Sequence, residues 1–387
     1  MTNKLSLFKV FMSNEVSEQL KETLYSGFIT QGPKVELFEK KLSEYIGNNY
    51  ILTVNSATSG LILALRLLKN KIDCMEWPGF DTEIDYVLTP ALTCFATTSS
   101  VLVNNYKIKW LDVDSNTSCV DLNDLEQKLN MNTKIVILVH WGGYPIDLDR
   151  VKYLQEQHYK KYNYRFQVIE DCAHSFGAEY KNIKLGNHNN MCVFSFQAIK
   201  HLTTGDGGAL VCPNAYLYDN GKLLRWFGID RDKRNYKNTD FRLENDIQEY
   251  GFKFHMNDIN ATIGLCNLKH IDEILIKNRN NYDYIYNNLS NNSNIRLLEN
   301  KQDRKSSCWL FTMCVREKDK FIKLMDENNI MVSQVHNRND KNTCVKQYIC
   351  DLPNLDKFEK EMICIPVGWW LDKEDLDKII NIINSIN

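Results

Sequence analysis

The chain has 387 residues, of which 43% are hydrophobic, and a formal net charge of −2 at pH 7. This length and apolar content allow a large core and two domains. A charge so close to zero gives no electrostatic footprint for nucleic acid, and no apolar run reaches membrane-spanning length. Because the first ten residues lack the apolar stretch of a signal peptide, we expect a cytoplasmic protein with no membrane partner.

The cysteines and histidines do not form a metal-binding pattern. The twelve cysteines contain no C-x-x-C pair and lie mostly in apolar contexts such as Met191–Val193. We interpret them as reduced core residues rather than as disulfides. The eight histidines show no metal-ligand spacing either, so no metal site is expected.

The first strong element signal is a strand over Tyr50–Val54, followed by a polar turn and a helix over Leu61–Leu68. The turn contains Ala57 and Thr58. Backbone N–H groups and hydroxyls at a strand-to-helix turn converge on an anion, which makes this turn a candidate phosphate site. The alternative is that the same residues only cap the helix.

Strand and helix signals then alternate along the chain. Further strands are expected at Tyr86–Thr89, Lys107–Leu111, Ile135–His140, Phe166–Glu170, Met191–Phe196 and Ala209–Cys212, with helix-length segments such as Ala91–Asn104 and Leu148–Tyr162 between them. This alternation predicts an α/β fold whose largely parallel or mixed sheet is covered by helices on both faces. After the Asn-rich stretch 278–294, a smaller α+β domain is expected.

The strand Phe166–Glu170 runs directly into Asp171. Ligands of α/β proteins bind at the carboxyl ends of parallel strands, so Asp171 is expected to project from a rigid element into that crevice. A helix cap is the alternative role for this aspartate.

Lys200 follows the strand Met191–Phe196 and precedes a glycine-rich turn. Burial there disfavours the ammonium form, so the amine can form an imine with a carbonyl compound. The alternative is an ordinary solvated lysine. A carboxylate and an imine-forming lysine on neighbouring strands are the two groups that pyridoxal phosphate needs, because the acid keeps the pyridine nitrogen protonated and the lysine holds the aldehyde.

Taken together, these segments resemble the DegT/DnrJ/EryC1/StrS family of pyridoxal-phosphate-dependent nucleotide-sugar aminotransferases. The likeness is close over residues 20–270 and looser beyond, and its motifs are G-P-x-V-x-x-F-E within Gln31–Glu39, P-x-L-T at Pro90–Thr93, D-V-D at Asp112–Asp114, V-H-x-x-G-x-P-x-D at Val139–Asp147 and G-x-x-x-x-M at Gly251–Met256. The resemblance implies fold type I. It predicts a large domain over residues 1–275, with a mixed, mostly parallel seven-stranded sheet between helices, and a smaller α+β domain over 276–387.

The resemblance also implies roles for the residues at the strand ends. Lys200 is expected to hold the cofactor and act as the general base, and Asp171 to pair with the ring nitrogen. Ser195 is expected to bind the cofactor phosphate together with Ala57 and Thr58. His174 is expected near the ring hydroxyl. For Ser195 the alternative is a strand serine that faces a neighbouring backbone. For His174 it is a core histidine whose hydrogen bonds are made within the protein.

Two departures from the family pattern change the expected contacts. Cys94 stands where the family has an aromatic residue stacked on the cofactor ring, so Phe95 or Trp141 is expected to stack instead. Lys253 replaces the asparagine that reaches the partner subunit's cofactor phosphate in the family, which implies a homodimer with shared active sites. The candidate substrate-binding residues are Trp141, His201, Arg231, His336 and Arg338. Surface loops are the alternative for the charged segments that carry Arg231, His336 and Arg338.

The implied reaction moves an amino group from L-glutamate to a keto sugar. A nucleotide-linked 4-keto-6-deoxyhexose is the expected acceptor, and the product is an aminodeoxy sugar for glycan biosynthesis. One alternative is a pyridoxamine-phosphate-dependent sugar 3-dehydratase, in which the family replaces the lysine by histidine; His201 is adjacent to Lys200. The others are an aminotransferase of another small keto substrate and a non-catalytic protein that keeps the fold.

Overall fold

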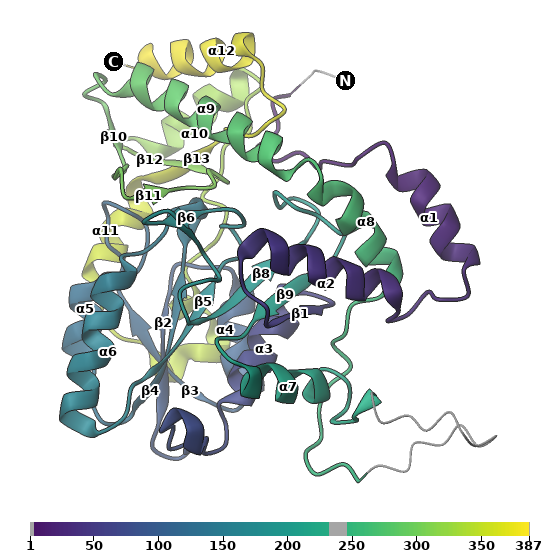
Figure 1. Ribbon diagram of the computed structural model, residues 1–387. Helices are drawn as coiled ribbons and strands as arrows, with labels where there is room; N and C mark the ends of the chain where they lie inside the picture. The colour runs from purple at the N-terminus through teal and green to yellow at the C-terminus, as the bar shows by residue number, and fades with distance from the viewer. Residues whose placement is uncertain (1–3, 232–245, 387) are drawn as a thin grey trace.

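The computed structural model describes residues 4–231 and 246–386 (Figure 1). Within them, the central sheet has seven strands in the order β1-β9-β8-β5-β4-β2-β3. β9 pairs antiparallel with β1 and β8, whereas the other pairs are parallel, as expected. The strands are β1 (Ile51–Val54), β2 (Tyr86–Pro90), β3 (Lys107–Leu111), β4 (Thr133–Val139), β5 (Gln167–Asp171), β8 (Met191–Ser195) and β9 (Gly208–Val211).

Helices cover both faces of this sheet. On one face lie α3 (Ala57–Leu67), α4 (Phe95–Val103) and α7 (Ala215–Leu224); on the other lie α2 (Pro33–Ile46) and α8 (Asp258–Leu268), with α1 (Val16–Tyr25) against α8. α5 (Leu122–Lys128) and α6 (Leu148–Tyr162) flank the sheet. Because side chains alternate along a strand, Val193 of β8 joins the core under α3, whereas Phe194 joins the core of Phe38 in α2.

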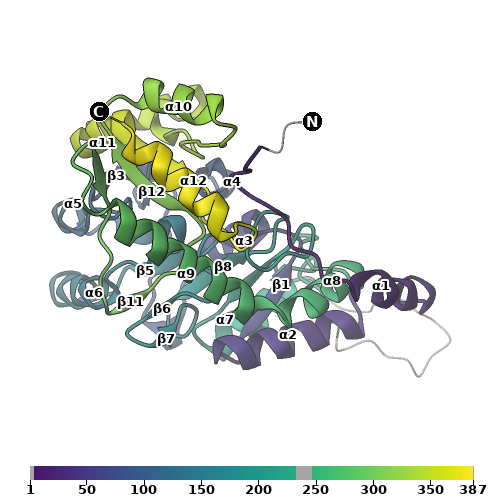
Figure 2. The same ribbon diagram turned by 90° about the horizontal axis from the view of Figure 1, so that it is seen from above.

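The C-terminal part forms a second layer around an antiparallel sheet in the order β10-β12-β13. Its strands are β10 (Ile295–Leu297), β12 (Phe311–Val315) and β13 (Met362–Ile365), and its helices are α9 (Ile271–Leu289), α10 (Lys318–Glu327), α11 (Pro353–Glu361) and α12 (Lys373–Asn384). α9 and α12 lie side by side over this sheet (Figure 2). β10, β12, β13, α9, α10 and α12 share a hydrophobic core of their own, which includes Phe311, Met325 and Ile379. α11 instead packs on the core of the large sheet through Leu355 and Phe358.

Three connections tie the two parts together. β6 (Glu179–Tyr180) and β7 (Ile183–Lys184) form a small sheet with β11 (Arg304–Lys305). Leu5 pairs with Ile330 and packs on the C-terminal core, so the N-terminal segment crosses to the smaller part. The third connection is α9, because the division expected at residue 276 falls inside this helix.

Two helices begin elsewhere than the sequence pattern predicts. The helix expected over Ala91–Asn104 begins only at Phe95, because Asn339 binds the preceding turn through the backbone carbonyls of Ala91 and Thr93. The helix expected from Leu61 already begins at Ala57, because Ser56 caps it by accepting a hydrogen bond from Ser59 N. Short 3-10 helices occupy Asp73–Met75, Trp141–Gly143, Asn339–Lys341 and Thr343–Tyr348.

All twelve cysteines are free thiols, and eight of them are buried. This arrangement agrees with the interpretation of reduced core residues. Among the helices that the structure describes, none combines the length and the apolar character needed to cross a bilayer.

Candidate active site

The ends of β1, β5 and β8 bring the predicted site residues to one edge of the central sheet. Asp171 ends β5 and pairs in register with Val193 of β8. Ser195 ends β8 and pairs with Gly208, which also pairs with Val54 at the end of β1. Residues far apart in sequence thus meet where the α/β fold places ligands.

The turn after β1 has the geometry of an anion site. Ser56 is the N-cap of α3, so helix capping and anion binding occur at the same turn. The backbone N–H groups of Ala57 and Thr58 lie in the first helical turn, where no intrahelical acceptor exists for them. A Cβ on Gly208 would lie 2.7 Å from Ala57 N, so only glycine allows β9 to approach this turn so closely. Ser195 on the neighbouring strand is buried.

Asp171 is only 4% exposed, and two donors bind its carboxylate. Thr97 Oγ1 donates to Oδ2 over 2.7 Å, and Ala173 N donates to Oδ1 over 3.1 Å. Burial raises the pKa of Asp171, whereas these two hydrogen bonds and the charge of Lys200 act in the opposite direction. The carboxylate can therefore pair with a cation such as a protonated pyridine nitrogen.

Lys200 is not an ordinary surface lysine. Its Nζ lies 3.5 Å from the ring centroid of Trp309, and its side chain is only partly exposed. Burial lowers the pKa of the amine to about 7, and the negative charge of Asp171 opposes this shift. A large fraction of Lys200 is thus an unprotonated nucleophile near neutral pH.

His174 is 3% exposed and stacks on Trp309, with ring centroids 3.9 Å apart. Its Nδ1 has no hydrogen-bond partner among the described residues. Burial and the charge of Lys200 hold the pKa of His174 well below its ordinary value, so the imidazole is neutral. A buried ring nitrogen without a partner is the kind of atom that a bound ligand satisfies. The donor set of these strand ends therefore fits pyridoxal phosphate.

His336 joins this cluster from the C-terminal part of the chain. Its ring is nearly parallel to that of His174, with centroids 5.6 Å apart, and Trp141 lies edge-on to both rings. Trp141 is fixed by a hydrogen bond from Nε1 to Thr312 Oγ1. Burial lowers the pKa of His336 to about 4. His336 follows Val335, whose φ of +68° is unusual for a β-branched residue and points to local strain.

A cationic cluster surrounds Trp226 beside the turn that follows β1. Arg231 Cζ lies 4.9 Å and Lys253 Nζ 5.5 Å from the ring centroid, and the ring of His255 packs edge-on to the same indole. The segment carrying Lys253 lies against Asn55, since Asn55 Nδ2 donates to the Lys253 carbonyl. Within one chain, this cluster thus lies next to the residues that precede α3.

The structure does not bring every predicted residue to the site surface. The buried His201 donates from Nε2 to the Ser307 carbonyl over 2.9 Å. Arg338 makes two 2.8 Å contacts with Asp340 and a further contact with Asp356. These bonds engage both side chains within the protein, so they favour structural roles.

Cys94 and Phe95 lie at the start of α4. Cys94 is the half-buried N-cap residue of this helix, and Phe95 is its first residue. Phe95 is 40% exposed. Trp141, the other residue expected to stack on the cofactor ring, is buried edge-on against His174 and His336.

Sequence reasoning missed two residues that contact the site. Trp309 touches Lys200 and His174, but it lies in the C-terminal third, where the motifs are loose. Thr97 binds Asp171 from a helix 74 positions earlier in the chain. No spacing rule connects these positions, because packing between elements brings them together.

His140, Glu170 and Cys172 bring their donor atoms within 4.8 Å of one another, a grouping that the histidine spacing did not predict. Ile146 N donates to His140 Nδ1, which places the ring proton on Nε2, 2.7 Å from Glu170 Oε2. Asn190 donates to the other carboxylate oxygen. Hydrogen bonds already use both ring nitrogens of His140, so we assign this buried cluster to hydrogen bonding beneath the site.

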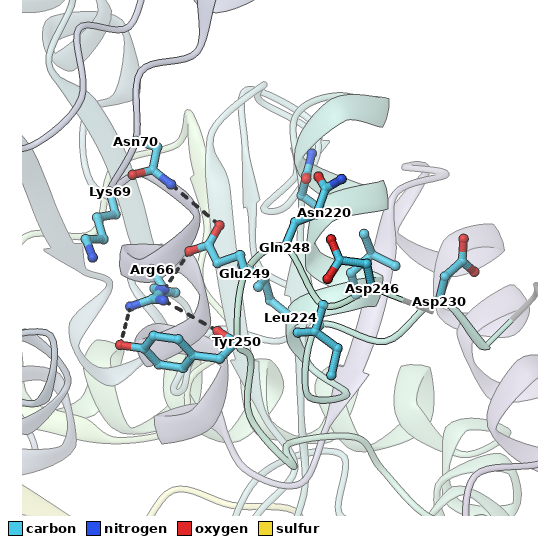
Figure 3. Close-up of a pocket in the computed structure, with 13 residues that line it drawn as sticks. Arg66, Lys69, Asn70, Asn220, Leu224, Asp230, Asp246, Gln248, Glu249 and Tyr250 are labelled. Carbon is cyan, nitrogen blue, oxygen red and sulfur yellow. Dashed lines mark hydrogen bonds and ion pairs between the residues drawn. The ribbon is translucent and has the colours of Figure 1, made fainter. Parts of the chain in front are cut away.

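A cavity of about 810 Å³ lies between α3, α7 and residues 246–250 (Figure 3). In its lining, Arg66 binds Glu249 over 2.9 Å and also contacts Tyr250. Arg66 is nine residues beyond Ala57 on α3, or about 14 Å along the helix. The cavity is thus separate from the strand-end site.

Fold and site together define a pyridoxal-phosphate-dependent enzyme of fold type I. The chain belongs to the DegT/DnrJ/EryC1/StrS aminotransferase family, whose model matches residues 11–384. This membership confirms the cofactor expected from Lys200 and Asp171, and it defines the enzyme as a sugar aminotransferase.

Solved structures agree over nearly the whole chain. AtS13 from Actinomadura melliaura is 40% identical, with a TM-score of 0.93 and 99% of each chain covered. The sugar aminotransferase CalS13 from Micromonospora echinospora is 36% identical, with the same TM-score and 99% and 100% covered. The putative sugar aminotransferase Spr1654 from Streptococcus pneumoniae, solved in its PLP form, is 25% identical with a TM-score of 0.86, covering 99% of this chain and 98% of that one.

Proposed function

We propose that this enzyme transfers the amino group of L-glutamate to the keto carbon of a nucleotide-linked 4-keto-6-deoxyhexose. The observation that carries the proposal is the juxtaposition of Lys200, whose pKa is about 7, with the buried carboxylate of Asp171. The bound cofactor supplies an electron sink for the carbon that loses its proton. Lys200 would hold the cofactor through its aldehyde, and its free Nζ would be the base that removes the proton from the donor Cα.

The other site residues hold the cofactor in place. Asp171 would keep the ring nitrogen protonated, and His174 Nδ1, which has no partner among the described residues, would bond the ring hydroxyl. Ser195 Oγ and the backbone N–H groups of Ala57 and Thr58 bind the phosphate. Cys94 and Phe95, at the start of α4, are the proposed contacts of the ring face.

The cationic cluster around Trp226 supports a phosphate-bearing acceptor. Arg231 lies over this indole, and a diphosphate is a ligand that a guanidinium binds. Lys253, over the same indole, is the cation proposed for the partner's cofactor phosphate. His336 and Trp141 are the proposed contacts of the sugar. The neutral imidazole of His336 suits a hydroxyl or keto oxygen, and Trp141 lies edge-on to this ring. A nucleotide diphosphate is also a good leaving group, so the aminated product is activated for glycan assembly.

We further propose a cytoplasmic homodimer with shared sites. Apolar side chains are exposed on α1 and the loop that follows, where Tyr25 is 85% and Phe28 60% exposed. Burying such side chains against a second copy is favourable. Lys253 is the residue proposed to reach the partner's cofactor phosphate.

The test is a screen of nucleotide-linked keto sugars with L-glutamate, read by mass spectrometry. We expect one or more 4-keto-6-deoxyhexoses to be converted to the amino sugar, with 2-oxoglutarate formed in equal amount. Lys200→Ala is the control and should form neither product. Conversion of only small, nucleotide-free keto acids would contradict the proposed substrate, and loss of a sugar hydroxyl without amination would favour the dehydratase.

A further inference from the structure

A chain of hydroxyl groups leads from the turn before α4 to Asp171. Thr97 Oγ1 lies 2.7 Å from Asp171 Oδ2, and Thr93 Oγ1 lies 3.0 Å from Thr97 Oγ1. An ionised carboxylate can only accept, so Thr97 uses its single hydroxyl proton on Asp171. Thr93 must then donate to Thr97. The direction of both bonds follows from the charge of Asp171.

Asn339, from the C-terminal part, holds this turn. Its Nδ2 donates to the Thr93 carbonyl over 3.1 Å and to Thr98 Oγ1 over 2.9 Å, and its backbone N donates to the Ala91 carbonyl over 2.7 Å. Because a carbonyl only accepts, the orientation of the amide is fixed by chemistry. Asn339 is itself buried.

The residues on either side of Asn339 stiffen this contact. Arg338 and Asp340 form a bidentate ion pair with two distances of 2.8 Å, and both side chains are buried. A bidentate guanidinium–carboxylate pair fixes orientation as well as distance. The segment that carries Asn339 is therefore rigid. Through Asn339, it fixes the position of Thr93 and Thr97 relative to the C-terminal part.

We propose that Thr97 is a positioning residue for Asp171, that Thr93 supports it, and that Asn339 fixes both. The hydroxyl keeps the carboxylate ionised and oriented toward the cofactor's ring nitrogen. This inference rests on the proposed role of Asp171 in cofactor binding. Burial disfavours the ionised carboxylate, and the structure gives it two hydrogen-bond donors, Thr97 Oγ1 and Ala173 N, so removing the Thr97 hydroxyl leaves it with one.

The test compares Thr97→Val, which removes the hydroxyl at nearly constant shape, with Thr97→Ser, which keeps it. A hydrogen bond to a charged group predicts that Thr97→Val weakens binding of pyridoxal 5′-phosphate to the cofactor-free protein by about tenfold or more. Thr97→Ser should bind it almost as tightly as the wild type. The dissociation constants are measured by titration of the intrinsic fluorescence.

A second readout separates positioning from a merely structural role. Losing the donor raises the pKa of Asp171 further, and a carboxylate is lost as the pH falls through its pKa. The affinity for pyridoxal 5′-phosphate should fall at low pH, a part of the pH profile that we call the acid limb. This fall should begin at a higher pH in Thr97→Val than in the wild type, and at the wild-type pH in Thr97→Ser. Asn339→Ala and Thr93→Val should move the acid limb in the same direction by less.

The matched control is Ser100→Ala, which removes a buried hydroxyl from the same helix. Ser100 Oγ donates to the Thr97 carbonyl and does not touch Asp171, so cofactor affinity and the acid limb should stay at wild-type values. If Ser100→Ala shifted both as much as Thr97→Val does, the effect would belong to α4 as a whole and the inference would fail.

Two failures are distinguishable. A folded Thr97→Val with wild-type affinity and an unchanged acid limb would overturn the positioning role while the proposed function stands. Wild-type protein that binds no pyridoxal 5′-phosphate would overturn the proposed function itself. If Thr97→Val does not fold, Thr93→Val decides: a moved acid limb supports the inference and an unmoved one overturns it.

Discussion

At the scale of single residues, Lys200 and Asp171 illustrate two opposing effects in one site. Burial drives both groups toward their neutral forms, whereas their mutual attraction favours both charges. For Lys200 burial prevails, and its pKa falls to about 7. The amine is thus poised between a cation and a nucleophile in the range where general bases are effective.

This pKa predicts the pH dependence of the first half-reaction. Only the unprotonated amine removes a proton, so the rate at which glutamate reacts with the loaded enzyme should rise with pH and level off above about 7. Stopped-flow absorbance at saturating glutamate measures this rate. A profile that is flat or falling across the neutral range would show that the basic form of Lys200 does not limit the step.

Asp171→Asn tests the partner of Lys200. A neutral amide cannot stabilise the protonated ring nitrogen, so we expect turnover to fall on the order of 10²-fold while the protein stays folded. Steady-state kinetics with circular dichroism as the folding control provides the measurement. Full activity with bound cofactor would remove Asp171 from this role.

At the scale of elements, the strands and the positions of Asp171 and Lys200 relative to them were predictable, because each depends on local sequence. A short apolar run followed by Asp171 indicates a buried strand and its end. Thr97 and Trp309 were not predictable in this way, because each reaches the site through packing between distant segments. The late start of α4 has the same origin, since Asn339 from the C-terminal part holds the turn before it.

The N-terminal segment packs against Trp309, a residue that contacts Lys200. Phe8 stacks on Trp309, with ring centroids 4.8 Å apart, and Trp309 contacts Lys200. Leu5 anchors the segment by pairing with Ile330. This arrangement links the start of the chain to the shape of the active site.

We therefore predict that Phe8→Ala lowers the free energy of unfolding by about 1 kcal/mol, because a half-buried aromatic ring loses its contact. It should also weaken cofactor binding, since Trp309 loses its support. Thermal melts and cofactor titrations measure both effects. Val10→Ala is the control, because Val10 is exposed and should change neither; equal effects of the two variants would contradict a specific role for Phe8.

At the scale of the whole molecule, the proposed dimer makes each site depend on two chains. Lys200→Ala and Lys253→Glu should each be inactive alone. After subunit exchange, a hybrid dimer contains one site with both residues intact, so partial activity should return. Size-exclusion chromatography of differently tagged chains confirms the exchange. Confirmed exchange without recovered activity would show that Lys253 does not serve the partner's site.

The most direct test of the account is the absorbance spectrum of the purified protein, reconstituted with pyridoxal 5′-phosphate, before and after addition of L-glutamate. We predict that the wild type is yellow and that glutamate bleaches it, because Lys200 and Asp171 hold the cofactor in its reactive form. Lys200→Ala should not show this cycle. Wild-type protein that takes up no cofactor, or a Lys200→Ala variant that turns over as fast as the wild type, would contradict the assignment.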